Sequence, residues 1–255
     1  MEEDHERDGR PQGVSEHREC GRIAGRLSTG RARKRNPPGA SAAPSAVASG
    51  QPKEDKTEDV SATEDLMREH GVIRRVLVVY REASARLRAK PASVTPDALQ
   101  QAAKLIRTFG EDYHEKQLEE MHIFPALMKA ASPLMNTVST LIVQHQRGRE
   151  ATEYILAVTR KAIGAAGAEP LARTLDAFAR MYEEHAAIED TIVFPAWKKV
   201  LTPKELDEMG DRFEDIEHKT FGKDGFGDAV DQVAVIEKIL GIELAALTAP
   251  PPLTP

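Results

Sequence analysis

The chain has 255 residues, of which 40% are hydrophobic and 30% are charged, and its formal net charge is −6. This composition is typical of globular proteins with a sizeable core, and the acidic balance argues against a nucleic-acid-binding protein, whose folded part would carry a basic face. The one cysteine, Cys20, excludes a disulfide framework and a cysteine-based metal site. No stretch approaches the roughly 18 consecutive apolar residues of a transmembrane helix, so we expect no membrane association.

The two ends of the chain are predicted to be disordered. Residues 1–58 are rich in Arg, Gly, Ser and Pro and have few large apolar side chains, so they cannot offset the entropy cost of folding. Residues 247–255 form a second, proline-rich tail. The basic run GRLSTGRARKRNPP in the first tail is not followed by the apolar segment of a secretory signal. We therefore expect a cytoplasmic protein, with export to the periplasm as the alternative.

Helical periodicity begins at residue 62. The segment 62–89 is predicted to be one amphipathic helix with Thr63 as its cap. The residues that share its apolar face are Leu66, Met67, His70, Ile73 and Leu77. After a break at KPASVTP, a second helix is expected over residues 96–130, with Gly110 as a weak point.

Two further long helices are predicted at residues 134–163 and 171–200, separated by the linker GAAGAEP. The first has an apolar face of Val138, Leu141, Ile142, His145, Gly148 and Ile155, and the second has one of Phe178, Met181, His185, Ile188, Glu189 and Ile192. Four long helices with short connections predict an all-α fold, an antiparallel four-helix bundle over residues 59–201. Additional helices are expected in a C-terminal extension, residues 202–246.

The second and fourth predicted helices contain an internal repeat. LEEMHIFPALMK at residues 118–129 matches IEDTIVFPAWKK at residues 188–199, which places Glu119 opposite Glu189. The histidines of the first and third helices correspond as well. Each helical hairpin therefore has a His on its first helix and a His with a Glu on its second.

These histidines and glutamates predict a metal site. Each of the four helices carries one histidine within its apolar face: His70, His114, His145 and His185. An unpaired buried carboxylate is costly, so Glu119 and Glu189 should be paired or bound to metal. Six nitrogen and oxygen ligands exceed the four of a closed zinc site and suit a dinuclear centre. Separate His–Glu hydrogen bonds in the core are the alternative.

The motifs REHGVIRRVL, YHEKQLEEMHIFP, QHQRGR and EEHAAIEDTIVFP, spread over residues 62–200, together resemble those of the hemerythrin-like (HHE cation-binding) proteins. The resemblance implies a four-helix bundle that holds two non-haem iron ions with an oxo or hydroxo bridge. It also implies that the four histidines are ligands and that Glu119 and Glu189 bridge the irons.

The sequence departs from the family pattern at two places. Arg149 stands where the oxygen-carrying members have a further His, and Glu115 is the candidate replacement ligand. His114 and Glu119 are five residues apart, which in a regular helix separates them by about 140°. A one-residue π-bulge would align them. Without a bulge, Glu115 and Glu119 share a face and His114 lies outside the site.

The resemblance implies binding of dioxygen or a related small oxidant, in oxygen, redox or iron sensing or in iron storage. An apolar pocket is expected around the site, with walls from Ile73, Leu118, Phe178 and Ile188. Two alternatives stay open: a di-iron oxidoreductase that acts on peroxide or nitric oxide, and a bundle that holds another metal such as zinc. No catalytic residue is assigned.

Overall fold

The computed structural model describes residues 60–131, 133–243, 250 and 252. The predicted tail at residues 1–58 and nearly all of the tail at residues 247–255 lie outside this part. The described residues form helices joined by short turns, with no strand among them. The all-α prediction is therefore confirmed. None of the described helices is both long and apolar enough to cross a membrane.

Helix α1, Ala62–Ala89, has the predicted bounds but not the predicted cap. Ser61 has an extended backbone, and its hydroxyl accepts the N–H of Glu64, whereas Thr63 already lies inside the helix. The prediction for Met67 was also wrong, because its side chain is 37% exposed. Met67 follows the buried Leu66 directly, and successive helical residues point about 100° apart.

The second helical stretch changes its winding along its length. It consists of α2, Pro96–Leu105, the π-helix η2, Ile106–Ile123, and α3, Phe124–Lys129. A short 3-10 turn, Pro91–Ser93, connects it to α1. At its end the N–H of Phe124 bonds to the carbonyl of Glu119, five residues earlier.

The same wide turn recurs in the fourth stretch, which consists of α5, Ala165–Ile188, the π-helix η3, Glu189–Val193, and α6, Phe194–Val200. Here the N–H of Phe194 bonds to the carbonyl of Glu189. Both wide turns are followed by a proline, which has no N–H and clashes with the carbonyl four residues back in a regular α-helix. The repeated Phe-Pro pair thus marks two equivalent π-turns.

Two predicted boundaries were wrong. Helix α4, Met135–Val158, ends five residues before the predicted residue 163. Helix α5 begins within the predicted linker GAAGAEP, because its alanines favour helix, and it includes Pro170. Ile188 and Ile192, which were expected in the core, are 36% and 42% exposed.

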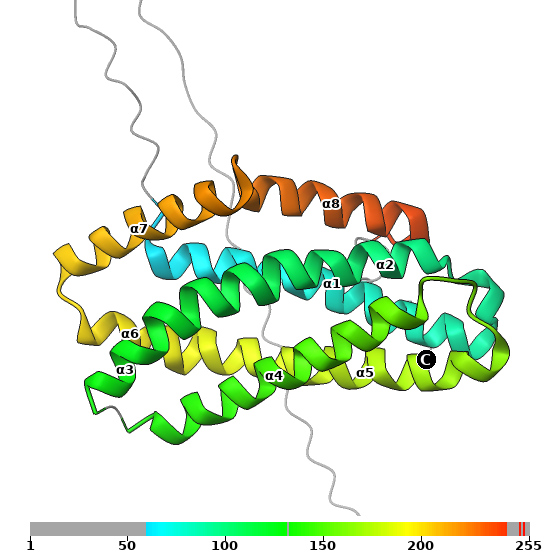
Figure 1. Cartoon of the computed structure of the whole chain (residues 1–255), viewed down its shortest axis with the longest axis horizontal. Coiled ribbons are helices and arrows are strands. Elements are labelled where there is room, and N and C mark those ends of the chain that lie inside the picture. The colour runs from blue at the N-terminus through cyan, green and yellow to red at the C-terminus, as the bar shows by residue number, and fades with distance from the viewer. Residues whose placement is uncertain (1–59, 132, 244–249, 251, 253–255) are drawn as a thin grey trace, which may run out of the picture. The chain divides into compact units, whose positions relative to one another are not determined.

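The C-terminal extension forms helices α7, Pro203–Phe221, and α8, Gly225–Leu240. The Thr202 and Glu205 side chains cap the start of α7 reciprocally. Helix α7 packs on α1 and η2, and α8 packs on α1 and α2. Figure 1 shows α7 and α8 along one edge of the view, with α4 and α5 along the opposite edge.

The four long stretches lie lengthwise beside one another (Figure 1). Helix α5 packs along α1 and α4, while α2 and η2 pack against α1 and α4. Each stretch therefore turns one face toward the others, and the predicted histidines lie on those faces.

Candidate metal centre

One histidine from each long stretch reaches a common centre. The Nε2 atoms of His70 and His114 are 3.0 Å apart, and those of His145 and His185 are 3.1 Å apart. All four side chains are buried, with at most 3% exposure. The structure thus arranges the predicted histidines as two pairs.

Glu119 and Glu189 each reach one histidine of both pairs. The nitrogen–oxygen distances, all to Nε2 atoms, are 3.4 Å for His114–Glu119, 3.3 Å for His145–Glu119, 3.4 Å for His70–Glu189 and 3.0 Å for His185–Glu189. None of these contacts has hydrogen-bond geometry. All four carboxylate oxygens are fully buried and have no hydrogen-bond partner among the described residues.

The outer nitrogen of every imidazole has an acceptor. The Nδ1 contacts are His70 to Asp190 at 2.7 Å, His114 to Glu69 at 2.5 Å, His145 to Glu120 at 2.8 Å and His185 to the side-chain oxygen of Gln144 at 2.9 Å. An Nδ1–H that donates to such an acceptor leaves the Nε2 lone pair facing the centre. Four lone pairs and two carboxylates then face one another. These groups repel one another unless cations or additional protons lie between them, so the arrangement fits bound cations.

The buried carboxylates favour the protonated form of the imidazoles at His70, His114 and His145, because they raise the pKa of each of these side chains. Burial lowers the pKa of His145, but the carboxylates of Glu115, Glu119 and Glu120 outweigh it and raise that pKa to about 10. Burial likewise raises the pKa of Glu189, but the adjacent imidazoles bring it below its usual range. Metal ions must displace the imidazole protons, so metal loading is expected to weaken as the pH falls.

The π-helical winding of η2 aligns His114 with Glu119. The two residues are five apart, yet His114 Nε2 lies 3.4 Å from Glu119 Oε1. Of the two alternatives that the sequence left open, the structure has the π-winding, which extends over Ile106–Ile123 instead of one residue, and His114 faces the centre.

Glu115 lies beside the six converging side chains but faces other partners. Its carboxylate accepts the hydroxyl of Tyr182 at 2.6 Å and the guanidinium of Arg149 at 3.1 Å. It is 3.9 Å from the outer nitrogen of His145. Gly148 makes room for this arrangement, since a Cβ there would lie 2.0 Å from the Tyr182 hydroxyl. Ligation by Glu115 stays a prediction.

The four outer partners of the imidazoles were not predicted from the sequence. These partners are Glu69, Glu120, Gln144 and Asp190. A signal for them exists, because each stands next in the sequence to one of the seven predicted site residues. Of the predicted pocket walls, Ile73, Leu118 and Phe178 are buried, whereas Ile188 is exposed.

Comparison with known proteins agrees with this geometry. The profile of the hemerythrin HHE cation-binding domain matches residues 61–197. An uncharacterized protein of Mycobacterium bovis and two of Mycobacterium tuberculosis, from strains CDC 1551 and H37Rv, are each 50% identical to the chain over 187 residues. Each match covers 72% of this chain and 71% of the relative. No solved structure matches. The chain therefore belongs to the hemerythrin HHE cation-binding domain family.

Proposed function

We propose that this protein holds two iron ions within an antiparallel four-helix bundle and binds dioxygen or a related small oxidant there. The observation that carries the proposal is the set of four buried oxygens of Glu119 and Glu189, which have no hydrogen-bond partner in the described part of the chain and face four Nε2 atoms. Buried carboxylates without partners are costly, and bound cations would remove that cost.

The donors divide naturally between two ions. His70 and His114 would hold one ion and His145 and His185 the other, with Glu119 and Glu189 shared. Imidazole and carboxylate donors suit iron, manganese and zinc. A structural zinc site is closed by four ligands to one ion, whereas six donors for two ions leave positions free for a small molecule. When bound, a ferrous pair supplies two electrons to dioxygen.

The chain's own residues orient the donors and exclude water. The Nδ1 acceptors hold each imidazole ring in one orientation, as is usual for metal-bound histidines. Ile73, Leu118 and Phe178 are buried and apolar. A dry, preorganised site of this kind favours reversible binding of a small oxidant, in sensing or storage, over its consumption.

Anaerobic loading with ferrous iron, followed by metal analysis and exposure to air, tests this function. The protein should take up close to two ions per chain and develop near-ultraviolet absorption on contact with air. His185→Ala and Glu189→Ala should each lose at least one ion. His122→Ala is the matched control, since His122 packs against Phe213 and is not one of the converging donors. Full iron loading in both site variants would refute the assignment.

Further measurements distinguish the proposed function from two alternatives. Sustained turnover of hydrogen peroxide by the iron-loaded protein would favour an oxidoreductase that uses the same centre. Metal analysis of protein purified from its own host would identify zinc or another metal in place of iron.

A further inference from the structure

The internal repeat extends to the outer partners of the imidazoles. Glu120 and Asp190 occupy equivalent positions, each directly after a converging glutamate. Glu120 bonds to His145, and Asp190 bonds to His70. In both cases the carboxylate bonds to the histidine of the other hairpin. We call each imidazole together with its outer partner a corner of the centre, so the corners at His145 and His70 are built alike.

The other two corners differ. Glu69 bonds to His114, while Gln144, the equivalent of Glu69, bonds to His185 through a neutral amide. Glu69 also accepts the hydroxyl of the buried Tyr113 at 2.9 Å. The residue equivalent to Tyr113, directly before His185, is the exposed Glu184. The corner at His114 is thus closed by a buried Tyr–Glu pair, and the corner at His185 is not.

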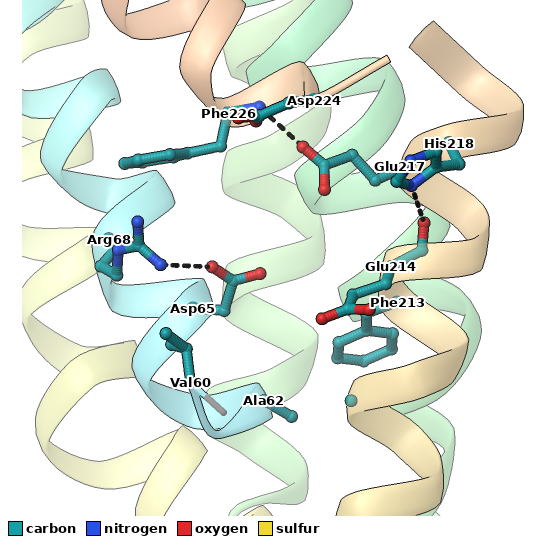
Figure 2. A pocket seen from close by; sticks show the side chains of 11 residues that line it. Val60, Ala62, Asp65, Arg68, Phe213, Glu214, Glu217, His218, Asp224 and Phe226 are labelled. Atoms are coloured by element: carbon teal, nitrogen blue, oxygen red, sulfur yellow. Dashed lines mark hydrogen bonds and ion pairs between the residues drawn. The ribbon is translucent and has the colours of Figure 1, made fainter. Parts of the chain in front are cut away.

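Helix α7 covers the corner at His114. The Phe221 ring meets the Tyr113 ring edge-on with a centroid distance of 5.1 Å, and the Thr220 hydroxyl bonds to Gln117 at 3.2 Å. Figure 2 shows Phe213 and other α7 side chains facing the start of α1. The cavity of about 390 Å³ that remains between α1 and α7 is not lined by His114 or Glu69.

The corner at His185 opens instead into a groove between α4 and α5. The groove has a volume of about 510 Å³, and both Gln144 and His185 line it. Its other walls are mainly apolar or uncharged, including Leu141, Ala187 and Ile188. Helices α7 and α8 lie at the opposite edge of the view in Figure 1 and leave this side uncovered.

We infer that the groove between α4 and α5 is the route by which a small uncharged molecule such as dioxygen reaches the His145–His185 half of the centre. This inference rests on the proposed function. Among the residues that the structure describes, no lysine or arginine lines the groove, and the only carboxylate in its lining belongs to Glu184. An anion would therefore meet repulsion and no counter-charge, whereas a neutral apolar molecule would meet a matching surface.

Metal-free protein offers a test that does not depend on iron. Methyl NMR relaxation under dissolved dioxygen reports where the gas resides. The Ile188 methyl groups should relax faster than those of Ile239, which is the matched control because the two side chains are 36% and 39% exposed. Equal relaxation would overturn the inference. So would Ile188 signals that shift with protein concentration, because a second copy would then cover the groove.

A bulky side chain placed in the groove provides a second test of the access route. Thr140 lines the groove and is exposed, so Thr140→Trp should fill it without disturbing the core. Ser139→Trp is the matched control, since both hydroxyl groups are exposed and bond the carbonyl four residues earlier. Thr140→Trp should remove the excess relaxation of Ile188, and Ser139→Trp should keep it.

With ferrous iron bound, Thr140→Trp should slow oxidation by dioxygen about tenfold relative to Ser139→Trp, which corresponds to about 1.4 kcal/mol in the barrier. Equal oxidation rates would overturn the access route and leave the proposed function standing. A protein that binds no iron, or whose iron does not react with dioxygen, would refute the proposed function, and the metal-free measurements would still decide the route.

Discussion

Replacing Glu111 with glutamine tests a buried carboxylate that the proposed centre does not use. Glu111 lies on η2 and is fully buried. Its Oε1 accepts the hydroxyl of Thr152 at 2.5 Å, and its Oε2 lies 3.1 Å from the guanidinium of Arg107. Burial raises the pKa of Glu111 from an ordinary value of 4.5 to about 7, and the Thr152 hydrogen bond opposes this only in part.

The direction and size of the effect follow from this pKa. The folded protein binds the Glu111 proton more tightly than the unfolded chain does. The resulting stabilisation is fully present below pH 4.5 and is lost as the pH rises through about 7. One pKa unit corresponds to about 1.4 kcal/mol, so the loss between pH 5 and pH 8 is about 2 to 3 kcal/mol. Glutamine has no proton to lose, so Glu111→Gln should gain that amount relative to the wild type over this interval.

Urea unfolding of the metal-free proteins at pH 5 and pH 8, followed by circular dichroism, measures this difference. Glu153→Gln is the matched control, because the Glu153 carboxylate is exposed and lies 3.7 Å from the same Arg107. Iron loading of Glu111→Gln should equal that of the wild type. A stability difference between Glu111→Gln and the wild type that is the same at both pH values would refute the reasoning.

Three further predictions concern the centre and the helices around it. His114→Ala should lose bound iron and Glu115→Gln should keep most of it, because His114 faces Glu119 whereas Glu115 faces Tyr182; metal analysis checks this, and full iron loading of His114→Ala would contradict the role given to the π-helix. Gly148→Ala should lower the free energy of unfolding by about 1 to 3 kcal/mol, since the added Cβ would lie 2.0 Å from the Tyr182 hydroxyl; unchanged urea unfolding would show that Tyr182 can move aside. Thr202→Ala should cost about 1 kcal/mol through loss of the reciprocal cap of α7, and an unaltered thermal midpoint would show that this cap contributes nothing.

Features that depend on neighbours along the chain could be predicted from the sequence. The period of apolar residues predicted the bounds of α1, because helical side chains three and four residues apart share a face. The five-residue spacing of His114 and Glu119 showed that a regular helix could not align the pair, but it left open whether a π-bulge aligns them or His114 lies outside the site. The six converging side chains were also identifiable, because a histidine or glutamate within an apolar face is costly without a partner.

Features that depend on contacts between helices were decided only by the tertiary structure. The sequence does not show that Asp190 bonds to His70 or that Glu115 turns toward Tyr182 and Arg149. These contacts depend on how each helix is rotated and offset against its neighbours, which no local pattern records. The same holds for α7, whose packing on α1 and η2 covers one corner of the centre. The equivalent corner at His185 stays open because no described helix packs there, and the two hairpins that look alike in sequence thereby become different in the folded protein.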